Sequence, residues 1–177
     1  LGASLLKGMG ILENLGSGEG LAWSFAFGLG GLGWLLFFFG VLNALSPPAL
    51  GTVLILATAG NVFLFDECRR VAMTIGSWRP SVWAAALLGA VAVIFFFDIL
   101  EGIAPPIEAD SLTYHFAMPK RFLVLGGLEF VPRAIDGAVP LLVQMTYVPA
   151  LGLGGELGLT LWTMVSGWAM AGLLFTA

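Results

Sequence analysis

An uncharged and predominantly apolar stretch covers residues 21–65 and is the longest such stretch in the sequence. As one helix it would be roughly 68 Å long, because an α-helix rises about 1.5 Å per residue, whereas the hydrocarbon core of a bilayer is only about 30 Å thick. The chain must therefore fold back. Pro47-Pro48 marks the place, since the residue before a proline is biased away from helical geometry. This pattern predicts a helical hairpin with membrane spans at about 21–43 and 47–65.

Three more apolar stretches follow along the chain. Residues 81–100 and residues 157–176 are long enough and apolar enough to predict two further spans. The stretch 138–154 is uncharged, but three residues that break or interrupt an apolar helix lie in it: Pro140, Gln144 and Pro149. We expect this stretch either to span the membrane or to lie at its interface.

Composition supports a membrane protein, because only 10% of the residues are charged and 59% are hydrophobic. An average soluble domain has about 25% charged residues, which form its solvated surface. The net charge of −4 also argues against nucleic acid as a partner. The predicted fold is therefore all-α, a polytopic transmembrane helical bundle that forms a single membrane domain over 1–177, with the lipid bilayer as its surroundings.

Basic residues predict the orientation of these spans, because lysine and arginine concentrate in short cytoplasmic connections. The connection 66–80 contains three of them, Arg69, Arg70 and Arg79. The turn at 44–46 contains none. We therefore expect 66–80 to lie in the cytoplasm and the turn to lie on the other side. The long polar segment 101–136 must then be an extracytoplasmic loop.

This loop contains eight charged residues interleaved with apolar ones, which favours one or two short helices lying along the membrane interface. Asp110 precedes apolar residues at helical spacing and suits the N-cap of such a helix. Gly126-Gly127 suits its C-terminal end. We expect a short amphipathic helix between these two points.

Two patterns within the spans each have a structural and a functional interpretation. The glycines of 28–33 (GLGGLG) superficially resemble a nucleotide-binding loop, but no strand precedes them, so close helix packing is the favoured interpretation. Asp98 and Glu101 lie three residues apart at the end of a span. They most simply mark where the helix leaves the hydrocarbon, whereas an inward-facing pair would indicate a functional site.

The most specific pattern lies in the loop and in the stretch after it. Residues 108–120 read EADSLTYHFAMPK, and residues 140–147 read PLLVQMTY. They resemble the D-[A/S]-L-x-Y-H-x-x-x-P-K and P-x-L-x-E-M-x-Y segments of bacterial polytopic glycosyltransferases of the GT-C fold, which are similar to protein mannosyltransferases and to lipid A aminoarabinose transferases. The resemblance covers about 105–155. The sequence departs from the pattern at Gln144, where an acid is expected, and it lacks a second acid directly after Asp110.

The resemblance implies an enzyme that moves a sugar from a polyprenyl-phosphate donor to an acceptor at the outer face of the bacterial cytoplasmic membrane. It implies that the chain is an N-terminal fragment of a longer multi-pass protein. Asp110 is the implied catalytic residue, as general base or metal ligand. The implied substrate-binding residues are Glu108, Tyr114, His115, Lys120 and Arg121. The cofactor is left open, with a divalent metal as one candidate.

These residue types suit transfer from a lipid-linked sugar. A base must reach the acceptor hydroxyl, and positive charge must stabilise the phosphate leaving group. Asp110 can supply the base, and Lys120-Arg121 can supply the charge, on a segment predicted to lie at the membrane surface.

Each of these residues also has a plainer interpretation. Asp110 can be an N-cap alone, His115 an interfacial hydrogen-bonding residue, and Lys120-Arg121 a contact to lipid headgroups. For the whole chain, the alternative is a non-catalytic transporter or membrane-scaffold fragment. A transporter should carry ionisable residues or broken helices near the middle of its spans. Here the predicted spans have no charged residue near their middle, and the charged residues are concentrated in one external loop. This distribution favours chemistry at the membrane surface.

Overall fold

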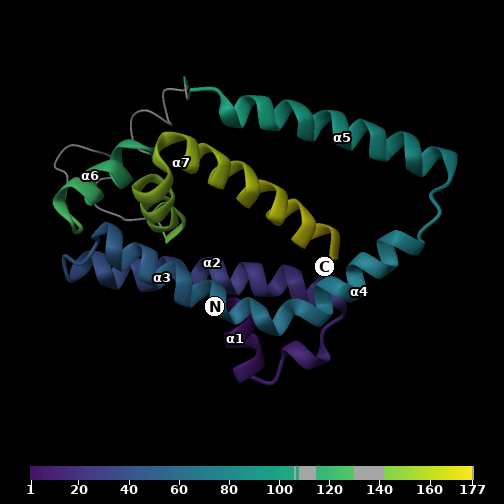
Figure 1. The fold of residues 1–177 in the computed structure, drawn as a ribbon, viewed down its shortest axis with the longest axis horizontal. Helices are drawn as coiled ribbons and strands as arrows, with labels where there is room; N and C mark the ends of the chain where they lie inside the picture. Colours follow the sequence, from purple (N-terminus) through teal and green to yellow (C-terminus); the bar gives the residue numbers. More distant parts are fainter. Residues whose placement is uncertain (106, 108–114, 130–141, 177) are drawn as a thin grey trace.

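The computed structural model describes residues 1–105, 107, 115–129 and 142–176 (Figure 1). The elements in chain order are α1 (Gly2–Gly8), η1 (Leu12–Asn14), α2 (Ser17–Val41), α3 (Pro47–Ala59), η2 (Gly60–Leu64), α4 (Phe65–Ser77), α5 (Val82–Ile103), α6 (Ala117–Leu125) and α7 (Leu142–Thr176). Within these ranges there is no strand, so the predicted all-α fold is confirmed. Four helical segments of the described chain are long and apolar enough to cross a membrane: Gly18–Val41, Pro47–Ser77, Val82–Ile103 and Leu142–Leu174. These segments identify a membrane protein.

α2 and α3 form the predicted helical hairpin. α2 ends at Val41, and α3 begins at Pro47, where the missing N–H of proline costs no helical hydrogen bond. Between them, Asn43 takes a left-handed backbone conformation with φ of 54°. Asparagine adopts this conformation more readily than most other residues do. The fold-back predicted from the two prolines is therefore confirmed.

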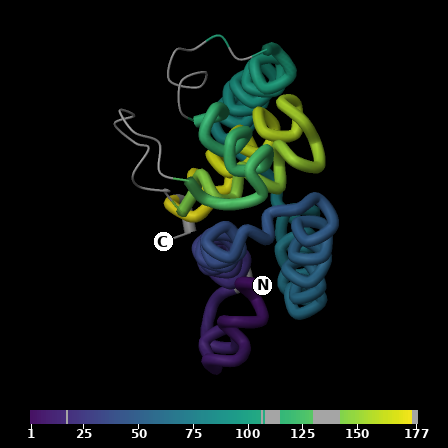
Figure 2. Tube along the Cα trace, turned by 90° about the vertical axis from the view of Figure 1, so that its left-hand side faces the viewer, coloured from purple at the N-terminus to yellow at the C-terminus, as the bar shows by residue number. Residues whose placement is uncertain are grey.

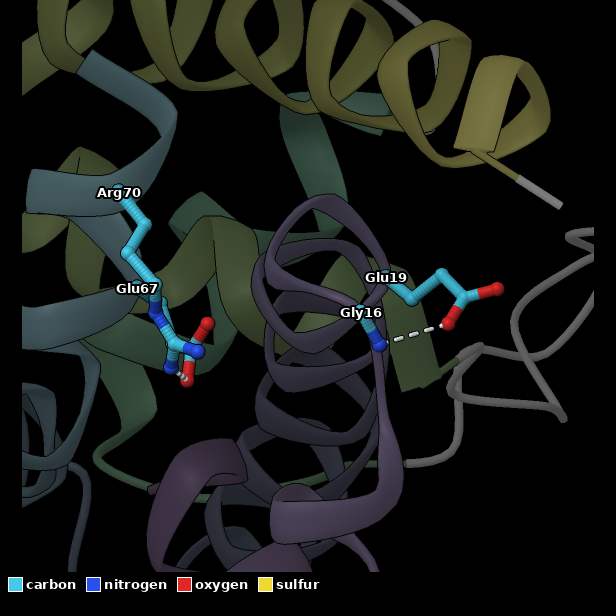
Figure 3. A network of polar contacts seen from close by, with 4 residues as sticks. All are labelled: Gly16, Glu19, Glu67 and Arg70. Atoms are coloured by element: carbon cyan, nitrogen blue, oxygen red, sulfur yellow. Dashed lines mark hydrogen bonds and ion pairs between the residues drawn. The ribbon is translucent and has the colours of Figure 1, made fainter. Parts of the chain in front are cut away.

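The connection predicted at 66–80 is helical as far as Ser77. It is part of α4, which follows α3 through the short helix η2. Charged and apolar residues follow one another at helical spacing here, so the segment forms an amphipathic helix rather than a loop. Glu67 is only 8% exposed, packs against the first turns of α2 and forms an ion pair with Arg70 (Figure 3). At the start of α2, the Gly16 N–H donates to the Glu19 carboxylate at 2.8 Å.

α6 is the short helix expected in the predicted loop. It ends as predicted at Gly126, whose φ of 72° is a left-handed conformation that glycine adopts freely. Its α-helical part begins at Ala117, with Phe116 as the N-cap. Pro119 lies in the first turn, where a proline is tolerated although it lacks an N–H. The N-cap predicted at Asp110 lies outside the described residues.

The helices run side by side, so their ends gather at two ends of the molecule (Figure 1). We call one of these the α6 end; it consists of residues 100–105 and 115–129, the turn 42–46 with the adjoining parts of α2 and α3, and the first part of α7 up to residue 160. The connection between α4 and α5 lies at the opposite end. Figure 2 looks onto the α6 end, where α5, α6 and α7 lie on one side of the molecule and α1 to α4 on the other.

Backbone hydrogen bonds join the turn after α2 to the segment after α6. The Leu45 N–H donates to the Gly126 carbonyl at 2.9 Å, and the Leu128 N–H donates to the Gly40 carbonyl at 3.0 Å. The turn and the α6 segment therefore share one end of the molecule, as the predicted alternation of spans requires. Which end faces the cytoplasm stays a prediction.

α7 consists of two helices separated by a break at Gly155, where the backbone is non-helical with φ of 64° and ψ of −162°. We call residues 142–154 the short α7 helix and residues 156–176 the long α7 helix. At about 1.5 Å per residue they measure roughly 20 Å and 32 Å. Only the long helix matches the roughly 30 Å of a bilayer core.

The short α7 helix lies inside the protein. A Cβ atom on Gly33 of α2 would lie 2.6 Å from the Leu142 carbonyl oxygen, and one on Gly152 would lie 2.9 Å from Leu123 of α6. Gly33 lies about 12 Å from the C-terminal end of α2, measured along the helix axis. The short α7 helix therefore begins beside the interior of α2 and runs from there back to α6. Four of its residues are at most 3% exposed: Gln144, Met145, Thr146 and Val148. The stretch 138–154 was predicted either to span the membrane or to lie at its interface. Its described part, the short α7 helix, is too short to span a bilayer core and is buried in the protein. Membrane proteins tolerate such a segment when protein surrounds it.

The hydrophobic core lies at the α6 end. It consists of Leu32, Leu36, Leu45, Leu50, Val53, Met118, Phe122, Met145 and Val148. Glycines bring the helices close together, since a Cβ on Gly28 would lie 3.3 Å from the Gly2 nitrogen and one on Gly31 would lie 3.2 Å from Leu1. The packing interpretation of the glycine-rich stretch 28–33 is therefore confirmed at Gly28, Gly31 and Gly33, whereas a Cβ on Gly30 would meet nothing within 4 Å among the described residues.

Candidate functional site

A cavity of about 750 Å³ opens at the α6 end, between the end of α5, the residues around it and the long α7 helix. Its lining includes Asp98 and Glu101 of α5, His115 just before α6, and Trp168 of α7. The short α7 helix contributes Tyr147. This is where titratable side chains from separate parts of the chain come together.

Asp98 and Glu101 both line this cavity. Asp98 is half-buried, and its Oδ2 accepts a hydrogen bond of 3.0 Å from the Trp168 indole N–H. The Trp168 ring stacks on Phe95, with ring centroids 4.5 Å apart. Glu101, one turn later, is exposed. The pair therefore turns toward the protein's cavity, which is the arrangement that favours a functional interpretation over a simple helix exit.

The cavity wall is fixed by a second contact between α5 and the long α7 helix. The Thr160 hydroxyl donates to the Gly102 carbonyl at 2.6 Å. This carbonyl belongs to the last turn of α5 and has no helical partner there, so the hydroxyl caps it. Gly102 also permits a close approach, because a Cβ there would lie 3.1 Å from the Met164 sulfur.

His115 and Gln144 connect the two sequence segments that carry the family resemblance. The Gln144 side-chain nitrogen lies 3.3 Å from the His115 Nδ1. Gln144 is only 3% exposed, whereas His115 is half-buried at the cavity. Segments that lie 29 positions apart in sequence thus meet at the edge of the cavity.

The structure does not bring Lys120 and Arg121 to the cavity. Lys120 Nζ lies 3.7 Å from a carboxylate oxygen of Glu156, and both side chains are well exposed. Arg121 donates to the Glu129 carboxylate from Nε at 3.0 Å and from Nη2 at 2.6 Å. The two cations expected to stabilise a phosphate are therefore paired with acids on the surface of α6.

Three of the predicted site residues, Glu108, Asp110 and Tyr114, lie outside the described residues. The described residues on either side of that segment, Ile107 and His115, both line the cavity. The catalytic role predicted for Asp110 stays a prediction.

The charge of the cavity limits what it can bind. Its described lining contains two carboxylates and neither lysine nor arginine. Such a lining favours neutral polar or cationic groups and disfavours a bare phosphate. In the part of the chain that the structure describes, no three histidine, cysteine or acidic side chains cluster as metal ligands do.

The sequence analysis includes Tyr147 in the second motif segment without giving it a role, and it does not identify Thr160 or Trp168 as site residues. A tryptophan within an apolar span carries an N–H that needs a partner, and this is a usable signal. It cannot identify Asp98 as the partner, because the two residues lie 70 positions apart and only the packing of α5 on α7 joins them.

No family model, no curated protein and no solved structure matches this chain. The resemblance to GT-C glycosyltransferases therefore stays a prediction that rests on the two sequence segments alone.

Proposed function

We propose that this protein is part of a membrane glycosyltransferase that moves a sugar from a polyprenyl-phosphate donor to an acceptor hydroxyl, at the outer face of a bacterial cytoplasmic membrane. Asp110 is the proposed general base or metal ligand. One observation carries the proposal: the motif segments around His115 and Gln144, remote in sequence, are in contact beside a cavity that carries two carboxylates.

In this proposal the cavity holds the hydroxyl-bearing part of a substrate. Carboxylates such as Asp98 and Glu101 accept hydrogen bonds from hydroxyl groups, and the faces of Tyr147 and Trp168 offer apolar surface. The phosphate of the donor would lie outside this acidic lining, toward Lys120, which must then leave Glu156. The polyprenyl chain stays in the lipid.

The decisive test replaces Asp110 with Asn in the full-length protein. Asparagine preserves the shape of the side chain but removes the basic carboxylate. Losing a general base lowers a rate by about 10²–10⁴-fold. We expect sugar transfer from the lipid-linked donor to fall by that factor, with normal membrane insertion. Asp66→Asn is the matched control, because Asp66 is an exposed acid of α4. Near-normal transfer by Asp110→Asn would refute the catalytic assignment.

A transporter is the second candidate, and one observation favours it. One of the apolar helices is not continuous, because α7 is broken at Gly155. Broken helices mark the binding sites of many transporters. The position of the break argues for the enzyme. Glu156 contacts Lys120 of α6, and Thr160 contacts the last turn of α5, so that the break lies at the α6 end rather than at the middle of the bundle.

The two candidates are separated by assaying the protein in detergent solution. A transporter has no compartments to connect there, whereas an enzyme still forms a glycosylated product. Product formation by the purified protein, lost in Asp110→Asn, supports the glycosyltransferase. Uptake of the donor into sealed vesicles without any product supports the transporter.

A further inference from the structure

A second concave surface, a groove of about 440 Å³, lies where the two α7 helices meet α3. Its described lining is apolar side chains and glycines: Leu54, Pro149, Ala150, Leu153, Gly154, Gly158, Leu161, Trp162 and Val165. The one polar atom among these side chains is already paired, because the Trp162 indole N–H donates to the Thr146 hydroxyl at 3.0 Å. The side chains that line the groove therefore have no free hydrogen-bonding group for water or for a polar ligand.

The groove lies at the depth of the hydrocarbon. Val165 lies about 14 Å along the long α7 helix from its start at the α6 end, and Leu54 lies about 10 Å along α3 from the same end. Both depths fall within a bilayer core of about 30 Å. Leu153 and Val165 are exposed, so the groove opens at the surface of the described protein. Water does not fill apolar space, and an empty space loses dispersion contacts, so hydrocarbon is its expected content.

Two opposite charges lie at the α6 end of the groove. Lys120 Nζ is 3.7 Å from a carboxylate oxygen of Glu156, and Glu156 lies in sequence between Gly154 and Gly158, which both line the groove. The two side chains are 67% and 64% exposed, so each has room for further partners. A cation beside an anion complements a headgroup that contains both a phosphate and an ammonium group. A headgroup with a phosphate alone would be repelled by Glu156.

We propose that this groove binds an acyl chain of a phospholipid whose headgroup contains a primary ammonium group, with the phosphate at Lys120 and the ammonium at Glu156. The lipid fills the angle that the break at Gly155 opens between the two α7 helices and α3. This binding does not depend on the proposed glycosyltransferase function. In the proposed enzyme, the phosphate of the sugar donor would have to displace the headgroup from Lys120.

Gly154 provides a substitution that fills the groove. A Cβ on Gly154 would meet nothing within 4 Å among the described residues, so Gly154→Leu can occupy the groove without displacing the protein around it. Gly158 is unsuitable, because a Cβ there would lie 2.7 Å from the Ala150 carbonyl oxygen. Gly172→Leu is the matched control. Gly172 belongs to the long α7 helix, its Cβ would be equally free, and it does not line the groove.

The test is photolabelling of the full-length protein in nanodiscs of phosphatidylcholine. They contain a trace of phosphatidylethanolamine with a photoreactive acyl chain, and the labelled residues are mapped by mass spectrometry. We expect strong labelling of residues 149–165, which unlabelled phosphatidylethanolamine suppresses and the same amount of phosphatidylglycerol does not. Helix α5 is the internal control for unspecific lipid contact, because its apolar residues are exposed along its length. Its labelling should respond equally to both competitors.

The variants separate the chain from the headgroup. In Gly154→Leu, labelling of residues 149–165 should fall to the level of α5, whereas in Gly172→Leu it should stay as in the wild type. In Glu156→Gln, phosphatidylglycerol should compete as well as phosphatidylethanolamine, because the anion that repels its phosphate is gone.

Three outcomes would overturn the proposal. They are equal competition by the two lipids in the wild type, unchanged labelling in Gly154→Leu, and no labelling of residues 149–165 beyond that of α5. The last outcome would show that protein rather than lipid covers the groove. If Gly154→Leu fails to fold, the competition in the wild type and in Glu156→Gln still decides the question. Sugar transfer is not measured, so this result is independent of the proposed function.

Discussion

The α6 end and the opposite end, where α4 connects to α5, are both built from apolar helices, yet they pack differently. At the α6 end, Leu36, Leu45 and Leu50 are at most 1% exposed. Near the opposite end, Val82 is 83% exposed and Leu87 is 69% exposed. Apolar side chains gain little by leaving lipid for protein, so hydrophobicity alone does not make them pack.

What distinguishes the α6 end is its backbone. It contains a tight turn, a broken helix and a short helix that begins beside Gly33 of α2. Such a backbone has polar groups that a continuous helix would satisfy internally, and in a membrane these must find partners within the protein. The hydrogen bonds between the turn and the segment after α6, and those between α5 and α7, are therefore found there, and so is the candidate site. The comparison can be tested at four points.

The largest expected effect is all-or-none and concerns which end meets which side of the membrane. In a Cys68→Ala background, Lys120→Cys at the α6 end should react with a membrane-impermeant thiol reagent in intact cells. Gly76→Cys near the opposite end should react only after permeabilisation. The opposite pattern would reverse the predicted orientation. Labelling of both in intact cells would contradict the placement of the two residues at opposite ends.

The next effect compares buried with exposed leucines. Leu36 is 0% exposed and Leu87 is 69% exposed. Leu36→Ala should lower the free energy of unfolding by about 2–5 kcal/mol, because the cavity that it leaves loses packing contacts on all sides. Leu87→Ala should change it by less than about 0.5 kcal/mol, as surface substitutions do. Reversible unfolding in mixed detergent micelles measures both. Equal effects would show that α5 is packed against something in the folded protein.

A smaller effect compares two glycines of the same helix. A Cβ on Gly33 would lie 2.6 Å from the Leu142 carbonyl oxygen, whereas one on Gly30 meets nothing within 4 Å among the described residues. Gly33→Ala should cost about 1–3 kcal/mol, because the backbone of the short α7 helix must shift. Gly30→Ala should be neutral or slightly stabilising, since alanine favours helix. If the two substitutions have the same effect in the unfolding measurement, the close approach at Gly33 does not contribute to stability.

The contrast between the two ends also explains what the sequence could predict. The spans, the fold-back at Pro47 and the end of α6 at Gly126 follow from local rules about charge, proline and glycine, and these were predicted. Pro119 in the first turn of α6 also fits a local rule, because a proline is tolerated there but not in the interior of a helix.

The candidate site depends on contacts that no local rule provides. Asp98 and Trp168 meet because α5 packs on the long α7 helix, and Gln144 meets His115 because the short α7 helix turns back at Gly155. The glycine at position 155 is visible in the sequence, but its left-handed conformation is not. Many of the other glycines are simply helical.

The smallest expected effect concerns the contact that holds α5 to the rest of the protein. The Thr160 hydroxyl lies 2.6 Å from the Gly102 carbonyl oxygen across helices and 3.0 Å from the Leu157 carbonyl oxygen of its own helix. The Thr163 hydroxyl, one turn later on the same cavity wall, donates to the Thr160 carbonyl within its own helix. Both threonines have nearly the shape of valine. Thr160→Val should therefore lower the free energy of unfolding by about 0.6 kcal/mol, a typical value for a hydrogen bond between membrane helices. Thr163→Val should have a smaller effect, because the carbonyl that it releases already has a helical partner. Equal losses in the two variants would mean that the bond to Gly102 adds nothing specific, and that α5 is held by the Asp98–Trp168 contact and the surrounding lipid.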